Sequence, residues 1–200
     1  MPYVLTVDQI DSRAGVDEVE PMLGRLSAIP TLLPFTRTVG DEFQGLLDQE
    51  LSVVDVILLL MREAHWHIGL GIGSVETPLT TSDPRAARGD AFVAARAAVD
   101  RAKVEPSHLA VAGVDGATPD TSDVETVFRL VEALRSKRSE QGWQAVDLIA
   151  SGQTQAQAAA QLRISRQAVG QRVQTAQWTL ERAAEPTLAR LLDRAERSAS

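Results

Sequence analysis

Apolar runs in the first 112 residues alternate between strand-like and helix-like spacing, and this alternation predicts a sheet covered by helices. Short runs rich in β-forming residues predict strands at 3–7, 65–72 and 109–112 and a β-hairpin over 35–46. Helical spacing predicts helices at 16–28, 51–64 and 89–103. The resulting order, β-α-β-β-α-β-α-β, contains the βαββαβ unit of the ferredoxin-like arrangement, so the predicted fold class is α+β.

The pattern changes after a cluster of turn residues at 113–120, and every later segment has helical spacing. We expect helices at 124–138, capped by Ser122 or Thr121, at 141–150, and at 155–162 behind a Thr154 cap. A long helix over 166–184 and a last helix beginning at Pro186 complete the pattern. The predicted domains are therefore an α+β domain at 1–118, a linker helix at 119–138 and an all-α domain at 139–200.

Three carboxylates are predicted to meet at one end of the sheet. Asp8 ends the first strand, and Asp41 and Glu42 follow Gly40 in the hairpin turn. Carboxylates held that close repel one another unless a cation or a proton lies between them. Hard divalent ions such as Mg²⁺ or Mn²⁺ prefer oxygen ligands, often together with the phosphates of a nucleotide. The alternative is ordinary turn chemistry, because Asp is a common turn residue.

The all-α part contains a segment with the spacing of a helix-turn-helix. Ala159 supplies the small residue that is needed where two helices cross, and Ser165 is a good N-cap for the second helix. Arginine and glutamine at the start of such a helix can form bidentate contacts with guanine and adenine. Arg163 occupies the turn position that is usually glycine, and the alternative is a plain helical bundle. The predicted DNA-contacting residues are Gln155, Ser165, Arg166, Gln167, Gln171 and Arg172.

Charge supports this division of roles. Residues 1–138 hold 13 Lys or Arg and 21 Asp or Glu, a net charge of −8. Residues 139–200 hold seven Arg and six acids, a net charge of +1. Contact with nucleic acid is therefore expected in the second part of the chain.

Composition excludes several classes of protein. The chain contains no cysteine, which excludes disulfides, thiolate catalysis and cysteine-based zinc sites. No basic segment precedes an apolar run at the N-terminus, and the apolar run at 53–61 contains Asp55 and is too short to cross a bilayer. We expect a cytoplasmic protein with no membrane partner. His65 and His67 are expected to share one face of a strand, which without a third ligand is a weak metal signal.

Four motifs together carry a family resemblance. They are VDQIDSR at 7–13, TVGDEFQGLL at 38–47, HIGLGIGSVET at 67–77 and RGDAFVAARAAV at 88–99. With these motifs the chain resembles the SatD family, whose members look like small relatives of class III nucleotidyl cyclases and GGDEF domains with a C-terminal helix-turn-helix. The resemblance implies metal-binding carboxylates at Asp8 and Asp41.

The resemblance also implies roles for other residues. Arg37 stands where cyclases often carry a base-reading lysine, and Arg96 stands where they carry an arginine that stabilises the transition state. Asp11, Ser12 and Arg13 could line a phosphate subsite. Phe92, however, replaces an asparagine that orients the ribose in cyclases. This loss favours a nucleotide-binding site over a complete catalytic one.

The sequence therefore leads to a primary hypothesis and two alternatives. The first is a homodimeric, DNA-binding transcriptional regulator whose cyclase-like domain senses a nucleotide or cyclic nucleotide, or pairs two protomers. The second is a metal-dependent nucleotidyl cyclase or nucleotide-condensing enzyme that uses Asp8, Asp41 and Arg96. The third is a front domain that serves only as a dimerisation scaffold.

Overall fold

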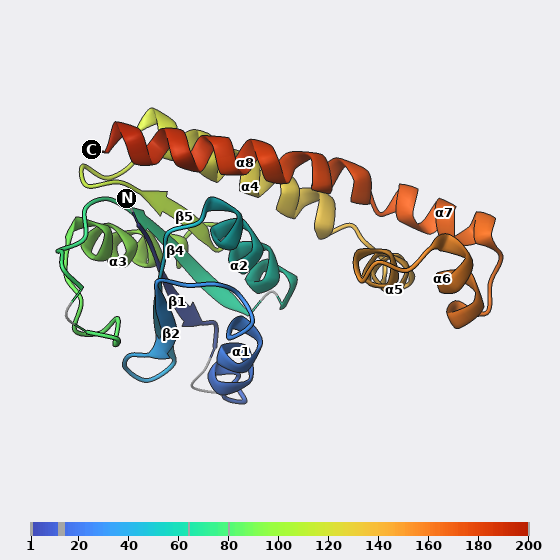
Figure 1. Ribbon diagram of the computed structural model, residues 1–200, viewed down its shortest axis with the longest axis horizontal. Helices are drawn as coiled ribbons and strands as arrows, with labels where there is room; N and C mark the ends of the chain where they lie inside the picture. Colours follow the sequence, from blue (N-terminus) through green and yellow to red (C-terminus); the bar gives the residue numbers. More distant parts are fainter. Residues whose placement is uncertain (1, 12–14, 64, 80, 200) are drawn as a thin grey trace. The chain divides into compact units, whose positions relative to one another are not determined.

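The computed structural model describes residues 2–11, 15–63, 65–79 and 81–199, which form a mixed α+β structure (Figure 1). The strands are β1 (Tyr3–Gln9), β2 (Leu33–Arg37), β3 (Glu42–Leu47), β4 (Trp66–Ile72) and β5 (Leu109–Ala112). The helices are α1 (Val19–Leu26), α2 (Glu50–Glu63), α3 (Asp90–Ala102), α4 (Pro119–Arg135), α5 (Glu140–Ala150), α6 (Gln155–Leu162), α7 (Arg166–Thr175) and α8 (Trp178–Ser198).

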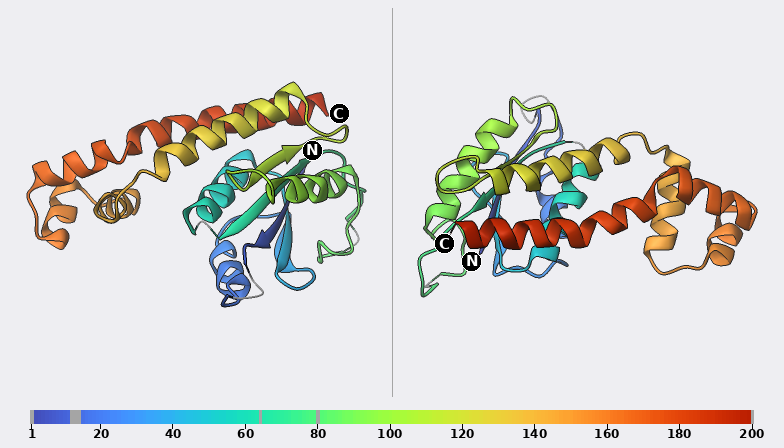
Figure 2. Two further views of the ribbon diagram at one scale, coloured as in Figure 1. Left: turned by 180° about the vertical axis from the view of Figure 1, so that it is seen from behind. Right: turned by 90° about the horizontal axis from the view of Figure 1, so that it is seen from above.

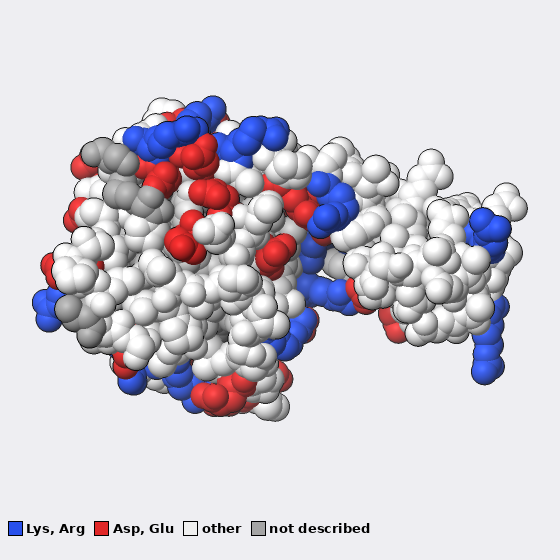
Figure 3. All heavy atoms as spheres, in the orientation of Figure 1, with Lys and Arg blue, Asp and Glu red and all other residues white. Residues whose placement is uncertain are grey.

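The chain divides into two compact units, which we describe separately. The first contains residues up to Arg129 together with those from Thr187 onward, and the second contains Leu130–Pro186. The segment after Pro186, which the sequence assigns to the all-α domain, therefore lies in the first unit. The second unit holds seven Lys or Arg and five Asp or Glu, a net charge of +2, whereas the first has −9. On the face drawn in Figure 3, most of the acidic atoms lie over the α+β unit.

The first unit is built on one five-stranded sheet in the order β2-β3-β1-β4-β5 (Figures 1 and 2). β1 pairs antiparallel with both β3 and β4, and β5 joins β4 in parallel. The predicted hairpin is confirmed, because β2 and β3 pair antiparallel across a turn closed by the Thr38 N–H to Glu42 carbonyl bond of 2.8 Å. The strand that comes first in the sequence therefore lies in the middle of the sheet.

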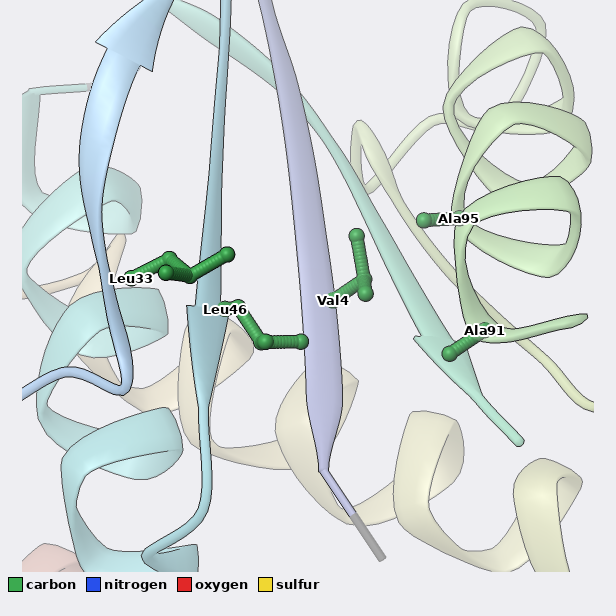
Figure 4. Packing of buried hydrophobic residues seen from close by; sticks show 5 residues of the cluster. All are labelled: Val4, Leu33, Leu46, Ala91 and Ala95. Atoms are coloured by element: carbon green, nitrogen blue, oxygen red, sulfur yellow. The ribbon is translucent and has the colours of Figure 1, made fainter. Parts of the chain in front are cut away.

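The two faces of the sheet are covered by different helices. The Tyr3 hydroxyl donates to Glu50 of α2 at 3.2 Å, and the Gln9 side chain accepts from the Glu18 N–H just before α1 at 3.0 Å. Side chains alternate along a strand, so odd-numbered β1 residues face α1 and α2. Val4 points to the opposite face, where it packs with Leu33, Leu46, Ala91 and Ala95 between the strands and α3 (Figure 4).

Two glycines of β4 let α3 approach the sheet closely. A Cβ added at Gly71 would lie 2.1 Å from the carbonyl oxygen of Ala91, and one at Gly69 would lie 2.3 Å from the nitrogen of Val99. Both distances are shorter than any real Cβ contact. The glycines therefore fix the position of α3 against this strand.

Side chains form hydrogen bonds with the backbone groups on the outer edge of β5. The Glu125 carboxylate of α4 accepts from the Val111 N–H at 2.9 Å, and Arg101 of α3 donates to the Val111 carbonyl at 2.8 Å. Arg101 and Glu125 also pair with each other at 2.7 Å. The pair thus takes the place of a neighbouring strand and covers an edge that would otherwise invite strand addition.

The second unit contains a small core formed by α5, α6 and α7. Ala158, Ala159 and Val169 are buried, and Leu148, Ile149, Leu162, Ile164 and Val173 pack against them. α6 begins with a capping box in which Thr154 and Gln157 satisfy each other's backbone N–H groups. α7 begins at a Ser165 cap whose hydroxyl accepts from the Ala168 N–H at 3.1 Å.

Two of the helix predictions are wrong. The long helix expected over 166–184 is broken after Thr175, and Gln177 just beyond has φ 54°. The helix ends there because two nitrogens of Arg138 donate hydrogen bonds to the Ala176 carbonyl, at 3.1 and 2.8 Å. Pro186 does not begin a helix but lies inside α8, which continues because Leu188 and Leu192 are fully buried.

The helix expected at 124–138 behind a Thr121 or Ser122 cap starts earlier than predicted, since α4 begins at Pro119, where the predicted linker segment also begins. Proline suits the first helical position because its missing N–H would have no helical partner there. The Thr118 hydroxyl accepts from the Thr121 N–H at 3.2 Å, so Thr118 rather than Thr121 or Ser122 caps the helix.

Candidate functional site

An open pocket of about 710 Å³ lies at the end of the sheet where β1 ends and the hairpin turns. Four carboxylates, two cations and one imidazole line it, so it is strongly polar. Its lining residues are Asp8, Gln9, Asp11, Gly15, Asp17, Arg37, Gly40, Asp41, His67 and Lys103.

Two of the three predicted metal ligands lie in this pocket. Asp8 stands on β1 directly opposite Glu42 of β3, and the Gln9 N–H donates to the Asp41 carbonyl at 3.3 Å, so the hairpin turn sits beside the end of β1. Asp8 and Asp41 both line the pocket, whereas Glu42 does not. The Glu42 carboxylate instead accepts from the Thr38 hydroxyl at 3.0 Å and pairs with Arg96.

Both cations of the pocket are matched with carboxylates. The Lys103 ammonium lies 3.4 Å from Asp8, and Arg37 pairs with Asp17. The hydrogen bond from Arg37 lowers the pKa of Asp17 and raises the pKa of Arg37. Among the residues that the structure describes, an anionic ligand can therefore meet positive charge here only by competing with these carboxylates, or by bringing a cation that neutralises them.

The structure places some of the other predicted ligand-binding residues in the pocket and others outside it. Asp11, which has φ 54°, lines the pocket with Arg37, whereas Ser12 and Arg13 lie outside the described residues. Arg96 is not among the lining residues, since its guanidinium pairs with Glu42 and lies 3.6 Å from Asp100. The structure thus brings Asp8, Asp11, Arg37 and Asp41 to one pocket. It places Glu42 and the predicted catalytic arginine, Arg96, elsewhere.

We asked whether these residues suit a divalent cation. In the described part of the chain, no group of three or more His, Asp or Glu side chains is positioned to hold a metal ion. Mg²⁺, however, is usually held by one or two carboxylates, with waters and substrate phosphates completing the shell. The donors Asp8 and Asp41 therefore suit an ion that arrives with a nucleotide, and do not suit an ion caged by protein alone.

Sequence reasoning missed a histidine pair at the pocket wall. His67 of β4 and His108, just before β5, place their Nδ1 atoms 3.2 Å apart with the rings edge to face. The sequence instead paired His67 with His65, which is exposed and precedes β4. Only the parallel pairing of β4 with β5 brings residues 67 and 108 together, and no local pattern reveals it.

The second candidate site is the outer surface of α6 and α7. Arg163 ends α6 in the left-handed conformation, with φ 56°, and its N–H donates to the Ala160 carbonyl at 3.4 Å. The turn therefore adopts a backbone geometry that favours glycine, although arginine occupies it.

Most of the predicted DNA-contacting side chains are exposed there. Gln155, Ser165, Arg166, Gln167 and Gln171 are all exposed. Arg172 is half-buried and lines a cavity of about 330 Å³ with Lys137 and Ser139, at the start of α5. The surface combines a polar helix start with nearby positive charge.

Comparisons with known proteins give one match. The model of the SatD family matches residues 27–180. No curated protein matches the chain. No solved structure matches it either. Within the described residues, every helix is too short or too polar to cross a membrane.

Proposed function

The chain belongs to the SatD family, and we propose that it is a sequence-specific DNA-binding regulator whose α+β unit binds a nucleotide. The observation that carries the proposal is the arrangement of α6 and α7. The two helices pack through the buried Ala158, Ala159 and Val169, and Arg163 between them adopts the left-handed conformation. Arg166 and Gln167 are exposed just after the Ser165 cap of α7. These features support a helix-turn-helix, a motif in which the second helix enters the major groove.

The predicted base contacts follow from the side chains at the start of α7. Arg166 suits guanine and Gln167 suits adenine, and each bidentate contact contributes roughly 1–3 kcal/mol of discrimination. Arg172 and Lys137, which line the cavity beside α5, are suited to phosphates. As a homodimer, the protein would read two half-sites about 34–36 Å apart, one turn of the duplex.

Selection of binding sequences from a random duplex library, followed by anisotropy titrations on the selected site, tests this function. Arg166→Ala and Gln167→Ala should each weaken binding about 5- to 150-fold, corresponding to the lost discrimination, and should relax the preference at one base pair. Gln174→Ala, an exposed change later on the same helix, should bind like the parent. Selection of no sequence, or full binding by both first-turn variants, would refute the assignment.

The architecture of the first unit supports a nucleotide-binding role. We infer a ferredoxin-like unit, like that of nucleotidyl cyclase and GGDEF domains, and the strand order β2-β3-β1-β4 with α1 and α2 on one face supports this inference. Asp8 and Asp41 would hold a Mg²⁺ or Mn²⁺ ion, which would neutralise the phosphates of the ligand. Arg37 and Lys103 would then exchange their carboxylate partners for phosphate oxygens.

Calorimetric titration with a panel of nucleotides and cyclic nucleotides, each with and without Mg²⁺, tests this role. We expect Mg²⁺-dependent binding that Asp41→Asn weakens at least tenfold and that Asp48→Asn, an exposed change just after β3, leaves unchanged. Equal affinity for both variants would remove the pocket from the proposal. Binding by no member of the panel would favour a front unit that acts only as a dimerisation scaffold.

An enzymatic function remains the second candidate, because Asp8 and Asp41 line the same pocket. A metal-dependent cyclase or condensing enzyme would release pyrophosphate from a nucleoside triphosphate, and Asp41→Asn would abolish that release. Arg96 would have to leave Glu42 to assist the reaction. Incubation with each triphosphate and Mn²⁺ decides between the two functions, and the absence of pyrophosphate with all four would exclude the enzyme.

A further inference from the structure

The His67–His108 pair has a geometry that neither the nucleotide pocket nor the DNA-binding surface requires. The two Nδ1 atoms lie 3.2 Å apart, at an edge-to-face ring angle of 63°. His108 has φ 50°, a backbone conformation that few non-glycine residues adopt, and it places the ring against β4 at the start of β5. Both side chains are half-buried, so each ring is held by its surroundings while solvent still reaches the pair.

The separation of the two nitrogens matches that of two histidines on one metal ion. Zn²⁺ binds imidazole nitrogen at about 2.0–2.1 Å. An ion at that distance from both Nδ1 atoms would form an N–metal–N angle of roughly 100–105°, which is close to the tetrahedral value. The spacing of the two nitrogens thus fits a shared ion, which also requires both Nδ1 lone pairs to point toward it.

The surroundings of His67 also suit a metal ligand. His67 donates to the backbone carbonyl of Ala102, and because Nδ1 faces His108 we assign this bond to Nε2. Metal-bound histidines characteristically direct their other ring nitrogen to a carbonyl in this way, which leaves the Nδ1 lone pair free for the ion. Burial, followed by the effect of His108, lowers the pKa of His67.

The nearby charges partly offset one another. Asp8 stands directly opposite His67 on β1, and its negative charge favours a cation at His67. Lys103 opposes this effect, although its ammonium is turned toward Asp8 at 3.4 Å. The charges of Asp8 and Lys103 therefore do not prevent a cation from binding at His67, in addition to the Mg²⁺ or Mn²⁺ proposed at Asp8 and Asp41.

We propose that His67 and His108 form a two-nitrogen site for a borderline divalent ion such as Zn²⁺ or Co²⁺, with solvent completing the coordination shell. His67 also lines the proposed nucleotide pocket, but the two sites differ in their donors. The histidine site uses imidazole nitrogens rather than the oxygens of Asp8 and Asp41 and so selects a different class of metal. It would also join β4 to β5 across the start of β5.

Titration of the untagged full-length chain with Co²⁺ tests the site, with absorption and calorimetry as readouts and Zn²⁺ as competitor. The chain has three histidines, which provides a matched control. We expect one equivalent of ion with the visible bands of tetrahedral Co²⁺ in the parent and in His65→Gln. His67→Gln and His108→Gln should each lose at least about 100-fold in affinity, more than the loss of an outer partner costs. Circular dichroism should show both variants folded.

Two further measurements keep the outcome unambiguous. Asp41→Asn should leave the Co²⁺ titration unchanged even if it removes Mg²⁺-dependent nucleotide binding. Imidazole nitrogen NMR should show both Nδ1 resonances shifting on addition of Zn²⁺. The proposal is overturned if the parent binds no Co²⁺, if either His67→Gln or His108→Gln binds as the parent does, or if Asp41→Asn abolishes binding. In each of those cases the 3.2 Å contact is an ordinary hydrogen bond between two rings.

Discussion

Replacing Gly71 by alanine should displace α3 from the sheet. The new Cβ would lie 2.1 Å from the Ala91 carbonyl oxygen and 2.3 Å from the Ala95 nitrogen, whereas ordinary contacts begin at 3.4 Å. Both neighbours are helix backbone, which cannot rotate away as a flexible side chain can. The helix must therefore move by more than about 1 Å, and overpacking of this kind costs about 3 kcal/mol.

Gly24→Ala is the matched control, since it introduces the same methyl group on an exposed position of α1 with no atom within 4 Å. That change should stabilise the protein by about 0.5–1 kcal/mol, because alanine is the better helix former. The two substitutions are thus expected to have opposite signs. For a chain of this size, a loss of 3 kcal/mol lowers Tm by roughly 6–12 °C.

Thermal unfolding measures the difference, and hydrogen exchange locates it. We expect Gly71→Ala to speed exchange in α3 and β4 while α5, α6 and α7 keep the protection of the parent. It should also weaken Mg²⁺–nucleotide binding, because α3 leads into Lys103, which faces Asp8 in the pocket. If Gly71→Ala is as stable as Gly24→Ala, the close packing of α3 on β4 described above is incorrect.

Three further changes test other parts of the structure. Thr154→Ala removes the capping box of α6 and should cost about 1 kcal/mol in urea denaturation, whereas an unchanged midpoint would contradict the cap. Glu181→Gln removes the carboxylate that Arg135 and Arg138 share, and their side chains are only 9% and 0% exposed. We expect the free energy of unfolding, measured by the same denaturation, to fall by about 3–5 kcal/mol. The lowered pKa of His67 means that the unfolded chain binds more protons just below pH 6.5, so stability should rise as pH increases through that window. His67→Gln should flatten this rise, and an unaltered pH profile would assign it to other groups.

The first half of the fold could be read from local sequence because each element carries its own signal. The short apolar, β-forming run at 3–7 predicted β1 and the Gly40-Asp41 turn predicted the hairpin, and both are present. The ends of neighbouring strands lie close together in a sheet, so the sequence also predicted that Asp8 and Asp41 would be neighbours. Both residues line the same pocket. Local periodicity is sufficient when the deciding interactions are close in sequence.

The errors arose where a distant side chain decides the outcome. α7 ends at Thr175 because Arg138, 38 residues away from Ala176, binds the backbone carbonyl there, and no nearby glycine or proline marks the break. His108 meets His67 through a parallel strand pair, although the two positions are 41 apart in the sequence. Glu42 lies opposite Asp8 in the sheet, but its carboxylate forms an ion pair with Arg96 of α3. Such pairings depend on tertiary structure rather than on spacing.

The central place of β1 has a consequence for biosynthesis. β1 ends at Gln9, yet its two neighbours are completed only at Leu47 and Ile72. At a synthesis rate of about 5–20 residues per second, the segment Tyr3–Val7 waits roughly 3–12 s for its second partner. During that interval an apolar, β-forming segment is available to other growing chains. Slower translation of residues 10–72 should therefore increase aggregation during synthesis without altering the stability of the finished protein.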